Sequence, residues 1–392
     1  MGWELASFAV EHMGPVPELE GVDVAVVQGG DPVRITHVLD VVEPRIRPDG
    51  RPAFPVAGRA GKGRTNRLEG VAVVSCLDFP AEERTLHEQE SVVDLAGPGA
   101  QLTPFAEGTN VVLTFRREDL ANEELEAWAR RTTLTVAEEL ARPTLEAEPA
   151  AVERFEPGPA DASLPAVAAL VQLSDLGPLY YQFVYGVPAG EAGLPRAVDP
   201  AEILDGAVTS GEYHWAALRN PTIVYQRSAL VRALYREHGK RLRFAGVVLM
   251  RGYEQTADDK QRAATAAADE AVELGADGAI VTTDAGGNSH TDVMLTVRAC
   301  EAAGVRTTAI VAEMADPDST SSGLTDWVPE ADSIVSAGNA EELVPAWEPE
   351  RVLGGDTLLD GTPAAAAGPI PVRNYLGATN QTGQHALTAT TW

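Results

Sequence analysis

The second half of the chain contains the apolar segment Phe244-Ala245-Gly246-Val247-Val248-Leu249-Met250, from which its fold class can be inferred. It is an unbroken apolar run, which is typical of a strand that a parallel sheet buries on both faces. A helix is expected to begin at Thr256, where Asp259 completes a capping-box pattern. The helix has an alanine-rich body and is expected to end at Gly275. The next strand is predicted over 278–282.

The same alternation of strand and helix extends on both sides of this unit. Further strands are predicted over 166–173, 306–312 and 333–336, and a further helix over 291–303. Strands that alternate with helices through short connections imply a parallel sheet flanked by helices. The predicted fold class is therefore α/β, with a Rossmann-like parallel sheet in the second half.

The first half has a different pattern, rich in β-branched residues. Strands are predicted in four places there: 22–27, 33–42, 70–77 and 110–115. A long helix is predicted over about 120–140, where Leu120, Leu125 and Trp128 recur at helical spacing. This half therefore reads as strand-rich, with one helix at its end.

The length of 392 residues suggests more than one domain, because a single core rarely grows that large. The stretch 142–164 is rich in Pro, Glu and Ala and is the predicted linker. We expect a strand-rich domain over 1–145 and a parallel α/β domain over 165–350. The tail, 351–392, is expected to pack on these domains or on a partner chain.

The net charge of −28 limits the kinds of partner that the chain can have. Nucleic acids and anionic membranes are disfavoured, because their binding relies on basic residues. No run approaches the roughly 20 apolar residues of a membrane span, and residues 1–5 do not resemble a secretory signal, so the cytoplasm is expected. The two cysteines, Cys76 and Cys300, are expected to be small buried hydrophobic residues.

Three loops should gather at the carboxyl edge of the predicted parallel sheet, where α/β sheets bind ligands. They are 251–255, 283–290 and 313–323. The second loop holds several polar and small residues: Asp284, Gly286, Gly287, Asn288 and His290. These residues indicate either close approach to a ligand or ordinary turn chemistry. The glycine-rich sequence motif of nucleotide-binding sites is not present, so no nucleotide is assigned as a ligand.

One further segment carries a resemblance to a known family. Leu204-Asp205-Gly206-Ala207-Val208-Thr209-Ser210-Gly211-Glu212-Tyr213, followed by Arg219-Asn220-Pro221-Thr222, resembles a processing site. The family is the pyruvoyl-containing component B precursor of glycine, sarcosine and betaine reductases. There, Asn-Cys stands at the positions of Glu212 and Tyr213, the chain breaks, and the cysteine becomes the pyruvoyl group. Neither residue is present here.

Other segments that are similar to the family follow in order along the chain. They are Val42-Glu43-Pro44-Arg45, Gly61-Lys62-Gly63-Arg64-Thr65-Asn66, Asp94-Leu95-Ala96-Gly97-Pro98-Gly99-Ala100, Val184-Tyr185-Gly186, Leu234-Tyr235-Arg236-Glu237-His238-Gly239-Lys240 and Leu376-Gly377-Ala378-Thr379-Asn380-Gln381-Thr382-Gly383. The resemblance thus covers almost the whole chain and implies a relative that kept the scaffold and lost the cofactor precursor. No cofactor is therefore expected, with Ser210 as the remaining alternative precursor.

The resemblance also points to candidate site residues. Glu212, Tyr213 and His214 replace the cofactor-forming segment and form either an acid/base set or a packed remnant surface. Four polar residues stand in family-like segments: Thr65, Asn66, Thr379 and Asn380. Together with Asn288 they are candidate substrate-binding residues, although such side chains also fix loops.

The implied function is that of one subunit in a hetero-oligomer. In the family a partner subunit supplies a selenocysteine or cysteine nucleophile, and we expect such a partner here, with a small carboxylic or amino-acid derivative as substrate. The expected reaction is thiol- or selenol-mediated C–N or C–heteroatom cleavage or substitution. Two alternatives are a non-catalytic scaffold subunit and a self-sufficient enzyme that uses Glu212 and His214.

Overall fold

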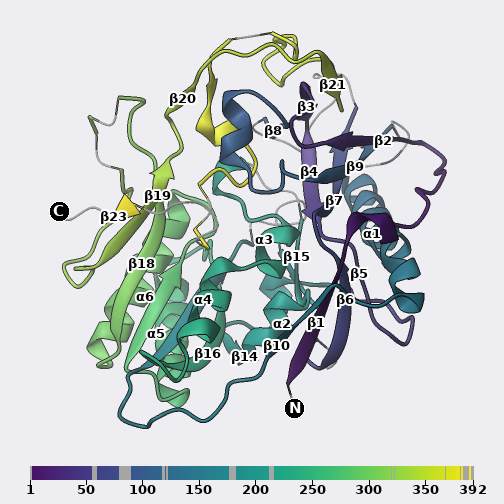
Figure 1. Cartoon of the computed structure of the whole chain (residues 1–392). Coiled ribbons are helices and arrows are strands. Elements are labelled where there is room, and N and C mark those ends of the chain that lie inside the picture. Colours follow the sequence, from purple (N-terminus) through teal and green to yellow (C-terminus); the bar gives the residue numbers. More distant parts are fainter. Residues whose placement is uncertain are drawn as a thin grey trace.

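The protein is described by a computed structural model in which two strand-rich layers lie beside a parallel sheet covered by helices (Figure 1). The described residues are 2–54, 60–78, 90–116, 120, 122–175, 182–211, 216–318, 320–321, 323–366, 368–379, 381–382 and 388–389. Figure 1 shows three short elements between the two halves: α2 (Pro200–Leu204), β15 (Val208–Ser210) and α3 (Thr222–Gln226).

The largest sheet has seven strands and lies in the second half. Their spatial order is β14 (Arg196–Val198), β16 (Arg243–Arg251), β11 (Ala166–Leu173), β17 (Gly278–Thr282), β18 (Arg306–Glu313), β19 (Ile334–Asn339) and β23 (Thr388–Ala389). The five strands from β16 to β19 are parallel, and the two outermost strands are antiparallel to their neighbours. The predicted strand 244–250 is confirmed as an interior strand, and β17 occupies the middle of the sheet.

Helices cover both faces of this sheet because side chains alternate along its strands. The helices are α4 (Ala229–Glu237), α5 (Ala257–Glu273) and α6 (Asn288–Ala302). Ala168 and Leu170 pack in the core with α5 and α6, whereas Ala169 and Val171 pack in the core with α4. The α/β class is therefore confirmed, and α6 begins at Asn288 rather than at 291.

The start and the end of α5 follow the predicted signals. Thr256 Oγ1 accepts a hydrogen bond from Asp259 N at 3.1 Å, and the Asp259 carboxylate accepts one from the Thr256 hydroxyl. Gly275 follows the helix with a φ of 68°, a left-handed conformation that glycine adopts without steric cost.

The first half contains two four-stranded sheets. One is β2 (Val22–Gln28), β9 (Thr109–Phe115), β7 (Val71–Leu77) and β4 (Val38–Val42). The other is β10 (Ala151–Phe155), β1 (Trp3–Phe8), β6 (Gly63–Leu68) and β5 (Arg45–Ile46). The helix α1 (Asn122–Ala141) buries Leu125, Ala129 and Ala137 in one core with Val73 and Val111. The strand-rich first half and its helix are therefore confirmed.

Short strands complete the fold. They are β3 (Val33–Thr36), β8 (Val92–Asp94), β12 (Gln182–Val184), β13 (Val187–Pro188), β20 (Leu343–Val344), β21 (Arg351–Leu353) and β22 (Ile370–Pro371). The strand β21 of the tail pairs with β3 of the first half, and β12 pairs with β15. Parts of the chain that are distant in sequence therefore share sheets.

Two regions differ from the sequence-based expectation. The strand predicted over 33–42 is broken at His37, whose φ of 53° turns the chain so that β3 and β4 join different sheets. The predicted linker 142–164 contains β10, which pairs with β1 and brings Phe155 onto Trp3 with 5.1 Å between ring centroids. The division into domains itself stays a prediction.

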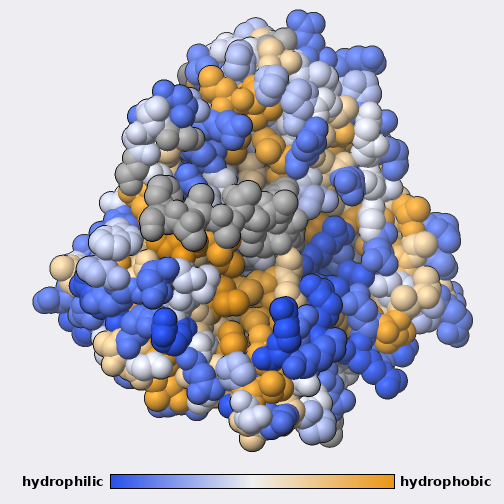
Figure 2. Space-filling model, turned by 60° about the vertical axis from the view of Figure 1, so that its left-hand side comes forward, coloured by the Kyte–Doolittle hydropathy of each residue, from blue (hydrophilic) through white to orange (hydrophobic). Residues whose placement is uncertain are grey.

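Hydrophilic residues cover most of the surface in Figure 2, and apolar residues gather in its recessed middle. This distribution agrees with the excess of carboxylates in the sequence. No helix in the part of the chain that the structure describes is both long and apolar enough to cross a membrane.

Candidate functional site

The segment 212–215 lies outside the described residues, so Glu212, Tyr213 and His214 are approached through the residues on either side. The strand β15 and Gly211 form the incoming flank, and residues 216–222 form the outgoing flank. Both flanks are buried. The contacts of these flanks therefore define the surroundings of the segment.

Asp284, which follows β17, is buried and fixes the outgoing flank. Its carboxylate accepts hydrogen bonds from Asn220 N at 3.1 Å and from Asn220 Nδ2 at 2.7 Å. It also accepts hydrogen bonds from Ser174 Oγ at 2.6 Å and Gln182 Nε2 at 2.7 Å. The outgoing flank is thus attached to the carboxyl edge of the parallel sheet through one carboxylate.

Asp40, on β4, connects both flanks to the first half. Its carboxylate accepts hydrogen bonds from Thr222 Oγ1 at 2.6 Å and from Thr222 N at 2.8 Å. Because the Thr222 hydroxyl donates its hydrogen to Asp40, it serves as the acceptor for Ser210 N at 2.8 Å. Thr222 therefore bridges the incoming flank, the outgoing flank and the first half.

The two carboxylates have similar electrostatic surroundings. Burial raises the pKa of Asp40 and of Asp284 to about 6, because hydrogen bonds offset only part of the cost of desolvation. Burial and the nearby Asp284 and Asp40 charges hold the pKa of the Tyr225 phenol well above its usual range. The site thus combines carboxyl groups that exchange protons near neutrality with a phenol that stays protonated.

The C-terminal tail closes the outgoing flank from another side. Gly377 N donates to Ala216 O at 3.0 Å. Thr379 donates to Ala217 O twice, from its N at 3.0 Å and from its Oγ1 at 2.8 Å. Thr379 therefore lies directly beside the flank, whereas Asn380 lies outside the described residues.

Thr65 and Asn66, on β6, lie in a different place. Thr65 Oγ1 donates to Asp205 Oδ1 at 2.5 Å and accepts from Trp3 Nε1 at 3.2 Å. Asn66 Nδ2 donates to Thr144 O at 3.2 Å and to Thr144 Oγ1 at 3.1 Å. Both side chains are buried in these contacts, and a substrate-binding role for them stays a prediction.

The first turn of α6 holds two residues of the predicted loop. Asn288 is exposed at the start of the helix, and its predicted substrate role also stays a prediction. His290 is buried, which lowers the pKa of its imidazole to about 4. Because Thr325 Oγ1 donates to Gly287 O, we assign the proton of the 3.0 Å His290–Thr325 contact to Nδ1. His290 is therefore neutral, with Nε2 as the unprotonated nitrogen.

Neither cysteine of the chain provides a reactive thiol. Cys76 lies on β7 and Cys300 on α6, and both are buried. Burial raises the pKa of each thiol to about 12, so neither forms the thiolate that a nucleophile requires at neutral pH. Within the described residues, no group of three or more His, Cys, Asp or Glu side chains is placed to hold a metal ion.

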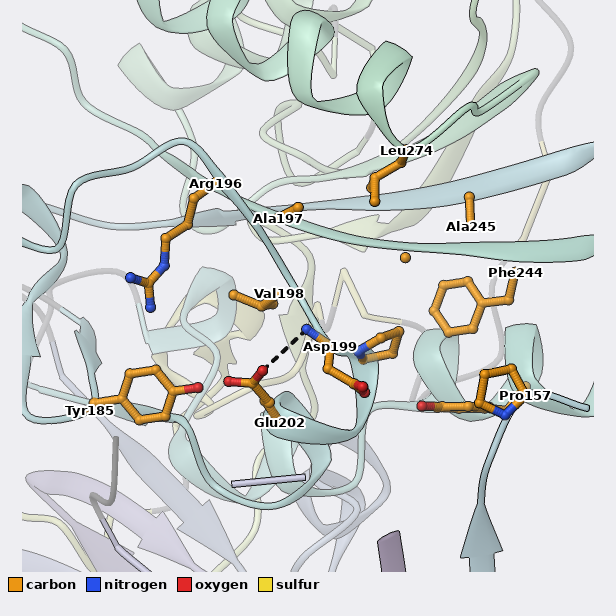
Figure 3. Close-up of a pocket in the computed structure, with 13 residues that line it drawn as sticks. Pro157, Tyr185, Arg196, Ala197, Val198, Asp199, Glu202, Phe244, Ala245 and Leu274 are labelled. Atoms are coloured by element: carbon orange, nitrogen blue, oxygen red, sulfur yellow. Dashed lines mark hydrogen bonds between the residues drawn. The ribbon is translucent and has the colours of Figure 1, made fainter. Parts of the chain in front are cut away.

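A cavity of about 730 Å³ lies away from this site (Figure 3). The Tyr185 hydroxyl and the Glu202 carboxylate point toward one another in it, and Glu202 accepts a hydrogen bond from Asp199 N at 3.3 Å. Phe244, another lining residue, is at the amino end of β16. Asp284 follows the carboxyl end of β17, which runs parallel to β16 with β11 between them, so the cavity and the candidate site lie at opposite ends of the sheet.

Sequence reasoning found only part of this network. Asp284 was singled out in its loop, and Asn220 and Thr222 stand in the family-like segment. Asp40 was missed, although a lone carboxylate within an apolar strand is a signal for a buried, hydrogen-bonded group. Ser174 and Gln182 carry no comparable signal in the sequence.

Comparisons with known proteins agree with this scaffold. The family model for glycine/sarcosine/betaine reductase component B subunits matches residues 8–390. The chain is 32% identical to the glycine reductase complex component B subunits alpha and beta of Acetoanaerobium sticklandii, over 98% of this chain and 92% of that protein. It is also 32% identical to the sarcosine reductase complex component B subunit alpha of Peptoclostridium acidaminophilum, over 93% of this chain and 84% of that protein. No solved structure matches the chain. The chain therefore belongs to the family of glycine/sarcosine/betaine reductase component B subunits.

Proposed function

We propose that this chain is a subunit of a heteromeric component-B-like enzyme, in which it shapes the substrate site and a partner subunit supplies the nucleophile. The substrate is a small carboxylic acid or amino-acid derivative. The reaction is a C–N or C–heteroatom cleavage or substitution mediated by a thiol or selenol of the partner.

The observation that carries this proposal is the state of the two cysteines. The chain has Cys76 and Cys300 and no others, and both thiols are buried and protonated. A thiol-dependent reaction therefore needs a cysteine or selenocysteine from another chain. The relatives are component B subunits of reductase complexes, which supports a heteromeric assembly.

The proposal includes no pyruvoyl cofactor. Position 213 is tyrosine, and Cys76 and Cys300 are buried in β7 and α6, so the residues do not fit a cysteine-derived pyruvoyl group. Ser210 is the alternative precursor, but its hydroxyl is engaged in a hydrogen bond to Gly211 O at 3.1 Å. We therefore expect an uncleaved chain.

Within this proposal, Glu212, Tyr213 and His214 act on the substrate as proton donors or acceptors. Thr379 and Asn380 position the substrate beside them, as does Asn288 at the sheet edge. Thr65 and Asn66 contribute at most indirectly, because Thr65 reaches the incoming flank through Asp205.

A scaffold subunit is the second candidate function. It is favoured because groups of the two flanks already have hydrogen-bond partners within the chain, namely Asp40, Asp284 and Thr379. A paralogue that has lost its cofactor would keep these contacts to preserve an interface.

Reconstitution tests the two functions. Co-purification with mass spectrometry should identify a partner that carries cysteine or selenocysteine. On the reconstituted complex, Glu212→Gln or His214→Ala should lower turnover on the order of 100-fold without loss of assembly. Glu237→Gln, which removes a partly exposed carboxylate paired with Arg241, is the matched control. Full activity in both site variants would exclude a direct catalytic role and favour the scaffold.

Chain integrity is tested separately by denaturing electrophoresis. One full-length band is expected, because no thiol is available to drive the acyl shift that breaks the backbone. Two fragments that meet near residue 210 would contradict this expectation.

A further inference from the structure

A groove of about 470 Å³ lies between the turn 47–51 and residues 62–64 at the start of β6 in the first half. Its charged lining residues are four cations and one carboxylate: Arg47, Arg51, Lys62, Arg64 and Asp49. The whole chain has 58 acidic and only 30 basic residues. A groove in which cations outnumber carboxylates runs against this overall balance of charge, and it attracts anions.

The two walls of the groove are tied together. Arg47 donates from one amino group to Lys62 O at 3.0 Å and from the other to Asp205 Oδ2 at 2.6 Å. Gly61 N donates to the same Asp205 oxygen at 2.8 Å. In the turn, Gly50 N donates to Arg47 O at 2.8 Å. The groove is thus preformed, and a ligand would bind without ordering its walls.

The cations at the rim are available to a ligand. Lys62 is exposed and has no salt bridge among the described residues. Arg51 and Arg64 pair with Asp49 and Glu4, but their side chains remain 53% and 42% exposed. Such exposed pairs contribute little stability, so each guanidinium can exchange its carboxylate for a ligand anion.

We propose that this groove binds the anionic group, a carboxylate or a phosphate, of a small molecule. Arginine side chains bind both groups through paired hydrogen bonds. The volume falls within the roughly 300–1,000 Å³ of small-molecule sites, so there is room for more than the anion alone. Gly63 has a φ of 70° and no atom within 4 Å of where a Cβ would stand, which lets a ligand approach the backbone.

This inference gives the family-like segment 61–66 a second role. Thr65 and Asn66 point into the protein, whereas Lys62 and Arg64 of the same segment line the groove. The groove also reaches the candidate site through Arg47, because its partner Asp205 ends α2 just before β15. An anion that competes with Asp205 for Arg47 would therefore loosen the incoming flank.

Calorimetric titration tests the groove without any assay of activity. The probes are sodium phosphate and sodium acetate, each at an ionic strength matched with sodium chloride. The site variant is Lys62→Gln/Arg64→Gln. The control is Arg241→Gln/Arg306→Gln, which removes the same charge from side chains that are 78% and 76% exposed elsewhere. Lys62→Gln alone serves as a second variant, because it breaks no salt bridge within the described part of the chain.

We expect one bound anion per chain in the wild type and in the control. The site variant should bind the anion at least about tenfold more weakly than the wild type, and the affinity of Lys62→Gln should lie between the two. Preference for phosphate or for acetate identifies the group that the site accepts, and either result supports the proposal. Absence of binding of both probes to the wild type, or equal weakening in the control, would overturn it.

Discussion

Asp40 lies on β4 and Glu43 just after it, yet the structure holds these two buried carboxylates in opposite ways. Glu43 accepts hydrogen bonds from Arg45 at 2.6 and 2.9 Å and from Arg227 at 2.7 Å, and Arg67 lies 3.8 Å away. Burial raises its pKa, but the charges of these arginines outweigh burial and bring the pKa below its usual range. Asp40 instead has neutral donors, and burial keeps its pKa at about 6.

The difference separates a purely structural connection, the cluster of Glu43 with Arg45, Arg67 and Arg227 that we call the structural joint, from the surroundings of the candidate site. The Glu43 cluster stays charged at every physiological pH and fastens the first half to the end of α3. Asp40 and Asp284 hold the flanks of the segment 212–215 with groups that change protonation near neutrality. The connection around Glu43 uses arginine, whereas the hydrogen-bond donors to Asp40 and Asp284 are neutral groups.

The substitution with the largest expected effect disrupts the structural joint. Glu43→Gln leaves the buried Arg45 without its counter-charge and should lower the free energy of unfolding by about 3–5 kcal/mol. Urea denaturation measures this loss. The surface variant Glu237→Gln should cost about 1 kcal/mol or less. A loss in Glu43→Gln no larger than in this control would remove the distinction between the two regions.

The pH dependence of stability sharpens the comparison. The pKa of Asp40 and Asp284 rises from 3.8 to about 6 on folding. Their protonation therefore adds to the free energy of unfolding in full below pH 3.8, and this contribution is lost as the pH rises through about 6. Each shift corresponds to on the order of 3 kcal/mol. Glu43 has a lowered pKa, so its contribution is present above pH 4.5 and is lost as the pH falls.

The measurement is the difference in free energy of unfolding between wild type and variant from pH 4 to pH 7.5. For Asp284→Asn, the advantage of the wild type should shrink as the pH rises through this window. For Glu43→Gln, it should grow over the acidic part. Parallel pH profiles for the two variants would show that both carboxylates are held in the same way.

A smaller effect is expected at the bridge between the flanks. Thr222→Val removes the hydroxyl that joins Asp40 to Ser210 and leaves buried polar groups without a partner. The expected cost is about 1–3 kcal/mol by urea denaturation. Thr135→Val, at an exposed position on α1, is the matched control and should cost about 0.5 kcal/mol or less. Equal costs would mean that Thr222 does not bridge the flanks.

The smallest effect tests redundancy in the joint. Arg227→Gln should cost only about 1 kcal/mol, because Arg45 and Arg67 remain beside Glu43 and the Arg227 side chain is 27% exposed. The same denaturation experiment checks this value. A cost as large as that of Glu43→Gln would mean that the cluster depends on all of its members.

Local signals account for the parts of the fold that the sequence predicted. The strand 244–250, the cap at Thr256 and the strand 278–282 are all encoded by neighbouring residues, and the structure confirms them. The strands β1 and β10 were missed, because they exist through pairing with each other and with β6 rather than through their own patterns.

The candidate site was predicted in pieces. The loop with Asp284 and the segment with Asn220 and Thr222 were each singled out, but nothing local indicates that Asp284 and Asn220 are in contact. That contact joins residues 64 positions apart, so only the tertiary structure reveals it. The predicted residues Glu212 and His214 lie outside the described residues, so their roles stay predictions.

The order of strands in the parallel sheet has a consequence for any attempt to divide the protein. The sheet runs β14-β16-β11-β17, so strands from before the segment 212–215 alternate with strands from after it. Fragments 1–211 and 216–392 would each have missing neighbours and open apolar edges, and each is expected to aggregate when expressed alone. When co-expressed, the two fragments should associate into one complex that elutes in size-exclusion chromatography at the same volume as the intact chain. The segment 212–215 is thus a suitable position for the split in a split-protein reporter.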